Sequence, residues 1–284
     1  MIRANTTAGI CTAASGTITT KDSLTSSSPR LDKLSKELHR QCGVLGELDD
    51  LTYHLKLDLE SLSSRDRLAV ASVSSGGCAP LFKACRVGNL GVARYLIDVC
   101  RVDVDQKGYT KEGARVYHNT TPLWYAAVKG HRRLVEFLLS VGADVNAVTD
   151  TGSTPIRSAC FSSRIDIVEL LLKHGADAEI ANCNGGTCLI NSVQSAPLCR
   201  MLLQHGVNAN VADLHGRTAV HYAVSMNKLE ALQVLAEFNA DFTTRTIQGE
   251  TPLMLACREA KCNVFEFLVD QVRRVHSSSS SSSA

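Results

Sequence analysis

A short motif that returns at a nearly constant distance constrains the fold of this chain more than any other feature. The motif resembles Thr-Pro-Leu, and its six copies begin at Ala79, Thr121, Thr154, Thr187, Thr218 and Thr251. The steps between these first residues are 42, 33, 33, 31 and 33. Apolar helical segments follow the first three copies at 92–97, 134–139 and 167–172. Such self-similarity predicts a stack of repeated units.

The residues of one unit explain how it folds. Threonine is a good helix cap, and proline at the first helical position loses an N–H that would be unpaired anyway. Small residues five and six places after the anchor allow close helix packing, as in Ala126-Ala127, Ala159-Cys160 and Ala256-Cys257. Gly142 and Gly175 are placed to end second helices. One unit cannot bury its own apolar face, so the units must stack.

This pattern resembles the ankyrin repeat, in which T-P-L-H-x-A recurs about every 33 residues. We therefore predict an all-α ankyrin-repeat solenoid of stacked helix-turn-helix units with β-turn fingers and no extended sheet. The six repeats cover 79–270, at about 79–120, 121–153, 154–186, 187–217, 218–250 and 251–270.

The segments on either side of the repeats differ from them in composition. Leu31, Leu34 and Leu38 share one helical face, so 31–75 is interpreted as degenerate N-terminal capping helices, with a separate helical hairpin as the alternative. The Ser/Thr-rich residues 1–30 and the Ser-rich residues 271–284 are predicted to be disordered tails. The long first step predicts a loop at 106–119, and long loops on rigid scaffolds often bind partners.

The eleven cysteines predict free thiols in a reducing compartment, because their number is odd and no C-x-x-C occurs. Cys85, Cys160 and Cys257 share one repeat position and are expected to be buried between helices. Cys183, Cys188, Cys199 and His205 lie within 23 residues, but their spacing matches no regular zinc pattern. No metal or other cofactor is therefore expected.

The remaining composition excludes several functional classes. Thirty Lys and Arg residues balance 28 Asp and Glu residues, so the chain lacks the basic surplus typical of nucleic-acid binding. No run of 18 apolar residues predicts a membrane span. The sequence contains no nucleotide-binding, serine-hydrolase or zinc-protease motif, so it is not expected to be an enzyme. We expect a cytoplasmic protein that can also be nuclear.

Several segments resemble a particular ankyrin family, the Fem (feminization) proteins. They are 121–127 (TPLWYAA), 153–161 (STPIRSACF), 165–168 (IDIV) and 187–190 (TCLI), together with the 42-residue first step. The second segment is the most specific, because a generic ankyrin unit does not require Arg157, Cys160 and Phe161. The resemblance covers roughly residues 40–270 and the N-terminal ankyrin region of that family.

The resemblance implies a substrate receptor that presents degradation signals, often C-terminal tails ending in arginine, to a cullin-RING ubiquitin ligase. The peptide degron would lie in a concave groove, and ligase components would bind through segments absent from this chain. The groove would include Trp124, Tyr125, Ser153, Arg157, Phe161 and Ser162. The inner-helix faces of neighbouring units add Asn191, Tyr222 and Met226. The repeat positions of Tyr125 and Ser162 predict side chains that point away from the seam between helices.

The chain departs from the family at one position that matters for specificity. The family motif continues Cys-Phe-Asp, and its aspartate helps to hold the substrate arginine, whereas this chain has Ser162 there. A guanidinium pairs bidentately with a carboxylate, which Ser162 lacks and Glu112 could supply instead. Two functions remain: the degron-binding region of a ligase receptor, or an ankyrin scaffold or competitive adaptor without ligase coupling.

Overall fold

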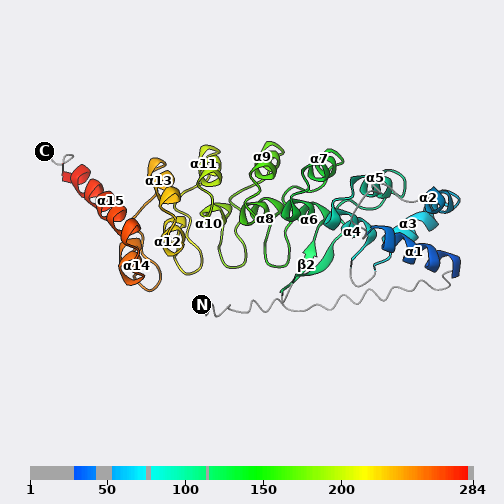
Figure 1. The fold of residues 1–284 in the computed structure, drawn as a ribbon, viewed down its shortest axis with the longest axis horizontal. Helices are drawn as coiled ribbons and strands as arrows, with labels where there is room; N and C mark the ends of the chain where they lie inside the picture. Colours follow the sequence, from blue (N-terminus) through cyan, green and yellow to red (C-terminus); the bar gives the residue numbers. More distant parts are fainter. Residues whose placement is uncertain (1–28, 43–52, 75–77, 113–114, 281–284) are drawn as a thin grey trace.

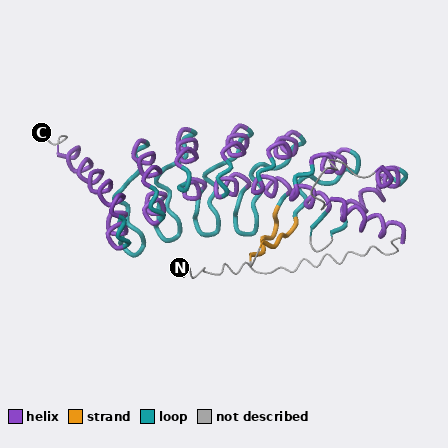
Figure 2. The backbone as a smooth tube through the Cα atoms, in the orientation of Figure 1, coloured by secondary structure: helices purple, strands orange, loops and turns teal. Residues whose placement is uncertain are grey.

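The computed structural model describes residues 29–42, 53–74, 78–112 and 115–280 and shows an elongated stack of helices (Figure 1). The residues 1–28 of the predicted N-terminal tail lie outside the described part. Helices form two rows along the stack, and loops project from one side of the inner row (Figures 1 and 2). The predicted ankyrin-repeat solenoid of stacked helix pairs is confirmed, with one short hairpin besides the helices.

Three helices lie at the N-terminal end of the stack: α1 (Pro29–Cys42), α2 (Tyr53–Glu60) and α3 (Ser64–Ser72). Both α1 and α3 pack against the first inner helix of the repeats, α4 (Pro80–Val87). Leu38, Cys42 and Leu59 are fully buried in this contact region. These helices therefore cover the side of α4 that faces away from the other repeats.

Six helix pairs follow, one for each anchor. The inner row is α4, α6 (Pro122–Lys129), α8 (Pro155–Phe161), α10 (Cys188–Ser192), α12 (Ala219–Ser225) and α14 (Pro252–Arg258). The outer row is α5 (Leu90–Asp98), α7 (Arg132–Ser140), α9 (Ile165–Lys173), α11 (Ala196–Gln204), α13 (Leu229–Glu237) and α15 (Cys262–Ser280). We number these pairs as units one to six.

The anchors start the inner helices as their chemistry predicts. The Oγ1 of Thr121 accepts a hydrogen bond from the N–H of Trp124 at 3.2 Å, and Thr251 does the same for Met254 at 3.3 Å. Gly130 ends α6 in the left-handed conformation, where its missing Cβ avoids strain. Capping thus makes these short inner helices begin at the same position within their repeats.

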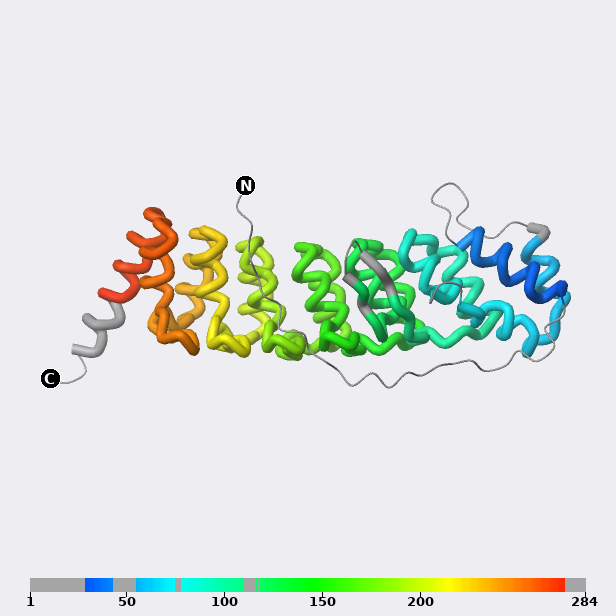
Figure 3. The backbone as a smooth tube through the Cα atoms, turned by 90° about the horizontal axis from the view of Figure 1, so that it is seen from below, coloured from blue at the N-terminus to red at the C-terminus, as the bar shows by residue number. Residues whose placement is uncertain are grey.

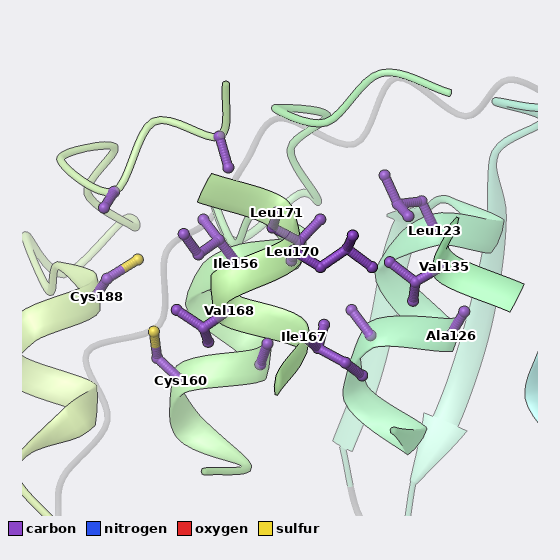
Figure 4. Close-up of a cluster of buried hydrophobic side chains, with 14 of the residues drawn as sticks. Leu123, Ala126, Val135, Ile156, Cys160, Ile167, Val168, Leu170, Leu171 and Cys188 are labelled. Atoms are coloured by element: carbon purple, nitrogen blue, oxygen red, sulfur yellow. The ribbon is translucent and has the colours of Figure 1, made fainter. Parts of the chain in front are cut away.

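A continuous apolar core joins the units. Figure 4 shows side chains of neighbouring units meeting between the two rows of helices. Leu123, Ala126, Ile156, Cys160, Ile167 and Leu171 are all 0% exposed. Each unit therefore covers the apolar face of the next, which is the reason that isolated units do not fold.

The turns between units also bond to one another. The backbone N–H of Asp150, Cys183, Leu214 and Ile247 donates to the carbonyl of His118, Thr151, Asn184 and His215, respectively. The distances are 2.9–3.1 Å. The turns stack so closely that a Cβ on Gly216 would lie 2.9 Å from the nitrogen of Ile247. Seen from below, the stack runs in a single continuous row (Figure 3).

The predicted loop at 106–119 is instead a two-stranded antiparallel hairpin. Its strands are β1 (Gly108–Glu112) and β2 (Arg115–Thr120), and Thr110 pairs with Tyr117. Because His118 accepts the bond from Asp150, the hairpin is the first member of the series of turns. Backbone pairing on both sides of β2 explains why this segment is a strand.

Two other expectations differ from the structure. Residues 271–280, predicted to be disordered, continue α15 to Ser280. Gly142, Gly175 and Gly206 follow three of the other outer helices in the left-handed conformation, whereas α15 has Val272 at that repeat position. Cys85 and Cys160 are buried, but Cys257 is exposed, because no described unit packs against that side of α14.

Candidate functional site

The candidate binding surface lies where the turns and the inner helices meet. The Tyr222 hydroxyl donates to the Asp213 carboxylate at 2.7 Å, which joins α12 to the preceding turn. Met226 follows Tyr222 by four residues and so lies on the same side of the helix. We call this side the inner face. It consists of the turns and of the positions four, seven and eight residues after each anchor.

Several large apolar side chains are exposed on the inner face, and we call four of them, Phe161, Met226, Leu214 and Ile247, the apolar strip. Phe161 and Met226, at the ends of α8 and α12, are 65% and 42% exposed. Leu214 and Ile247, at neighbouring turns, are 63% and 76% exposed. Leu214 and Ile247 share one repeat position, and Phe161 and Met226 stand seven and eight residues after their anchors. Exposed apolar side chains that gather on one face indicate an interaction surface.

The sequence analysis identified only half of this strip. It named Phe161 and Met226 but missed Leu214 and Ile247. The signal was present, because both residues occupy the turn position that holds Asp150 or Cys183 in other units. Two further apolar side chains, Tyr109 and Val116, are 40% and 43% exposed on the hairpin and lie at the N-terminal end of the same series of turns.

Arg157 joins α8 to the turn that leads into the next unit. Its Nε donates to the carbonyl of Gly186, the residue before the Thr187 anchor, at 2.9 Å, and an Nη donates to Ser153 at 3.3 Å. His221 occupies the same repeat position, and its Nε2 contacts the carbonyl of Glu250 at 3.3 Å. Arg157 therefore replaces the histidine of the repeat motif, and its polar atoms point into the stack.

Trp124 and Tyr125 are buried, at 4% and 2% exposure. The Tyr125 ring lies edge-on to Phe82 of α4, with ring centroids 4.9 Å apart, and to Trp124 at 5.8 Å. The expectation that Tyr125 points away from the seam is therefore corrected. The cause is the neighbouring unit, which offers a large aromatic ring where a smaller residue would leave space.

The other predicted site residues are partly accessible or buried. Ser162 ends α8 and is half-buried. Asn191 is half-buried and donates to the carbonyl of Arg157 at 3.4 Å. Ser153 is buried, and its hydroxyl contacts that of Ser158 at 2.8 Å. The side chain of Glu112 lies outside the described residues. Of the nine predicted residues, only Phe161 and Met226 are exposed.

The polar groups of the inner face mostly fix its shape. One Asp213 oxygen accepts from the N–H of His215 and of Arg217, both at 2.8 Å, while the other accepts from Tyr222. Burial and the Asp213 carboxylate raise the pKa of Tyr222 to about 12. Tyr222 is therefore a neutral donor at physiological pH and keeps the turn against α12.

The cysteines and histidines belong to the scaffold. Desolvation raises the pKa of the Cys85 thiol well above its usual range, so this sulfur is a poor nucleophile. His131, His174 and His205 each place a ring nitrogen within 3.2 Å of a backbone carbonyl. Among the described residues, no three His, Cys, Asp or Glu side chains cluster as metal ligands would. No helix in the described ranges combines the length and apolarity needed to cross a bilayer.

Comparison with known proteins gives one family and a set of relatives. The model for ankyrin repeats in three copies matches residues 59–149, 111–182, 174–246 and 189–278. Protein fem-1 homolog A-like of Mus musculus is 38% identical over 200 residues, which are 69% of this chain and 30% of the mouse protein.

Two other relatives match shorter segments. Protein fem-1 homolog CG6966 of Drosophila melanogaster is 35% identical over 106 residues, 37% of this chain and 16% of the fly protein. Alpha-latrotoxin-Lh1a of Latrodectus hasselti is 37% identical over 82 residues, 29% of this chain and 5% of the toxin. The chain thus spans less than a third of the length of these relatives.

Proposed function

The chain belongs to the ankyrin-repeat family, and from this premise we propose that it is the degron-binding region of a Fem-like ubiquitin-ligase receptor. The observation that carries the binding role is the apolar strip on the inner face. Phe161 and Ile247 are each more than half exposed, although core positions in the same units are fully covered. Contact with a partner would remove this apolar area from water.

The geometry of the strip favours an extended peptide. Packed helices lie about 8–10 Å apart, so Phe161 and Met226, two units apart, are separated by roughly 20 Å along the stack. An extended chain spans about 3.3–3.6 Å per residue, so about six residues cover that distance. A tail with two apolar side chains about six residues apart would therefore contact both ends of the strip.

The Fem-like role rests on the sequence resemblance and on the similarity to two fem-1 homologues. Ser162 is half-buried at the end of α8, beside exposed Phe161. With a hydroxyl rather than a carboxylate at that point, the surface offers an arginine tail no bidentate partner there. We therefore propose an apolar-rich tail as the substrate, in a cytoplasmic or nuclear setting.

The test is a display library of C-terminal peptides, screened against the natural chain and two variants. Phe161→Ser should lower enrichment of bound peptides at least about tenfold, since it truncates an exposed aromatic contact. Ile165→Ser is the matched control, because Ile165 is 36% exposed but begins the outer helix α9. Equal losses in both variants would contradict binding on the inner face.

Extension of the selected peptides separates a degron receptor from a scaffold. A receptor for C-terminal tails should lose binding when residues are added beyond the terminal carboxylate. A scaffold or adaptor that holds internal segments should bind the extended peptides equally well, and that result would favour the alternative function. Ser162→Asp should shift the preference toward tails ending in arginine.

A further inference from the structure

Exposed positive side chains gather on one edge of the stack, where the inner helices of units one to three end and their outer helices begin. The stretches 79–97, 121–135 and 154–165, each of which starts at an anchor, contain no Asp or Glu. In the whole chain 30 Lys and Arg residues are nearly balanced by 28 Asp and Glu residues, so this edge departs from the average. Six basic residues of these stretches are exposed: Arg86, Arg94, Lys129, Arg132, Arg133 and Arg164.

A pocket of about 520 Å³ lies within this edge. It is formed between the N-terminal ends of α5 and α7, which are neighbours in the outer row (Figure 1). Four of the side chains that line it can carry a positive charge, and we call them the basic pocket: Arg94, His131, Arg132 and Arg133.

His131 connects units one and two at this pocket. Its Nε2 lies 3.2 Å from the carbonyl oxygen of Arg86, at the end of α4. The ring also packs against Gly88, where an added Cβ would lie 2.6 Å from ring atoms. This contact fixes the wall of the pocket across the boundary between the two units.

The neighbouring outer helix holds two of the arginines in place. Arg94 of α5 lies over the ring of Phe137 in α7, with its Cζ 4.8 Å from the ring centre. Arg132 of α7 donates from Nε to Glu136 at 3.0 Å and from an Nη to the backbone carbonyl of Asp166 in α9 at 3.1 Å. Because these guanidinium groups are positioned before a ligand arrives, binding costs less ordering of side chains.

The pocket keeps positive charge that the protein does not neutralise. Glu136 compensates Arg132, but neither Arg94 nor Arg133 forms an ion pair with any of the described residues. Arg164 adds a further charge beside the pocket, since its guanidinium carbon lies 3.0 Å from the place that a Cβ on Gly130 would take. An anion in contact with this edge would therefore gain Coulomb energy that salt screens only partly.

We propose that the basic pocket binds an acidic segment of a partner protein, in which Asp or Glu side chains alternate along an extended chain. The exposed bases from Arg86 to Arg164 span units one to three, roughly 20 Å at about 8–10 Å between packed helices. One carboxylate or phosphate covers a small part of that length, whereas about six extended residues cover all of it. Arginine side chains also match carboxylates in bidentate geometry.

The charge of the rest of the molecule disfavours a nucleic acid at this place. Nucleic-acid-binding domains carry a large basic surplus, whereas the net charge of this chain is only +2. Acidic side chains such as Asp105, Asp144 and Asp177 follow the outer helices of the same three units. None of the residues that line the pocket belongs to the inner face, so the proposal does not depend on degron binding.

The test uses fluorescence polarisation of a labelled peptide with the full chain. The probe is a fluorescein-labelled peptide of alternating Glu and Gly, about eight residues long so that it covers the three units. The same peptide with Gln in place of Glu is the control. At an ionic strength of about 0.15 M, where remote charges are screened, the Glu peptide should bind and the Gln peptide should not.

Two charge reversals decide whether the pocket is responsible. Arg133→Glu should weaken binding of the Glu peptide by about tenfold or more, because it replaces an attractive charge with a repulsive one. Lys228→Glu changes the net charge equally and is the matched control, since Lys228 is exposed in unit five at the repeat position of His131. It should leave the affinity unchanged. Arg164→Glu is the second variant should Arg133→Glu fail to fold by circular dichroism.

Four results would overturn the proposal. Equal weakening by both reversals would mean that the peptide responds to net charge alone, and equal binding of the Gln peptide would mean that carboxylates are not recognised. Tighter binding of a single-stranded thymidine oligonucleotide of the same charge would identify a nucleic-acid site. Displacement of the peptide by an equal concentration of inorganic phosphate would identify a site for a single anion.

Discussion

At the scale of single residues, the structure separates side chains that hold units together from those available to a partner. Arg157 and Phe161 lie one turn apart on α8, yet Arg157 bonds to the turn before the next unit while Phe161 is 65% exposed. From the sequence alone, the segment 153–161 that contains both residues was predicted to line the peptide-binding groove. Only the position of the turn before Thr187, which brings the Gly186 carbonyl to Arg157, shows that their roles differ.

This separation predicts opposite effects for two alanine variants. Arg157→Ala should lower the free energy of unfolding by about 1–3 kcal/mol, because it leaves the Gly186 carbonyl without its charged donor. Phe161→Ala should change that free energy by no more than about 0.5 kcal/mol, since the ring is mostly in solvent. Urea unfolding followed by circular dichroism measures both. A larger loss for Phe161→Ala would mean that the ring is a packing residue.

Tyr222 predicts a pH dependence of stability at alkaline pH. Its pKa is raised from 10 to about 12 in the folded chain, so the folded state holds this proton more tightly than the unfolded state does. The resulting stabilisation is complete below pH 10 and is lost as the pH rises from 10 to about 12. Because Tyr222 is partly exposed, we expect a contribution of only about 1 kcal/mol.

The comparison variant for this effect is Tyr222→Phe, which cannot ionise or donate to Asp213. At pH 8 it should be less stable than the natural chain, and the difference should shrink as the pH approaches the folded-state pKa. Urea midpoints at several pH values from 8 upward test this. A difference that stays constant over the whole range would contradict the coupling.

At the scale of elements, the side chains that a helix buries depend on the neighbouring element as well as on the helix's own sequence. Thr-Pro anchors and glycine stops predicted helix positions from local chemistry, and the structure confirms the helical units. Local rules could not show that Tyr125 is buried, because its partner Phe82 lies 43 residues earlier, on α4. They also could not show that 106–119 pairs as strands, because β2 is completed by the turn at Asp150.

The thiols give a prediction at this scale. Without any partner, Cys257 and Cys262 of α14 and α15 should react rapidly with a thiol reagent, while Cys85 and Cys160 should react only after denaturation. The reason is coverage by a neighbouring helix, not the local sequence, since Cys257 and Cys160 share a repeat position. Peptide mapping by mass spectrometry after timed labelling measures this. Slow labelling of Cys257 in a monomeric sample would show that another segment covers it.

At the scale of the whole molecule, the stack behaves as a series of nearest-neighbour contacts. The covered positions of one unit depend on the unit beside it, so burial could be predicted from sequence only where the neighbours are known. This is the reason that Cys257 was misjudged, whereas Cys85 and Cys160 were not. The apolar strip was half predicted for a related reason, because an apolar residue in a turn is informative only once the turns are seen to align.

This series of contacts predicts that one substitution has different consequences in the middle and at the end of the stack. Leu171 in α9 and Leu268 in α15 occupy the same repeat position, and both are 0% exposed. Leu171→Ala should lower global stability by about 2–5 kcal/mol, because unit three is packed on both sides. Leu268→Ala should unfold unit six locally, since that unit has only one neighbour and opens at a lower free energy.

Hydrogen exchange measured by mass spectrometry distinguishes these outcomes. In Leu268→Ala, faster exchange should be confined to α14 and α15, while α6 and α8 keep the protection of the natural chain. In Leu171→Ala, exchange should accelerate on both sides of α9, because both neighbouring units lose part of their interface. If Leu268→Ala instead lowered protection equally in every unit, the chain would unfold as one cooperative body, and unit six would be as stable as the centre.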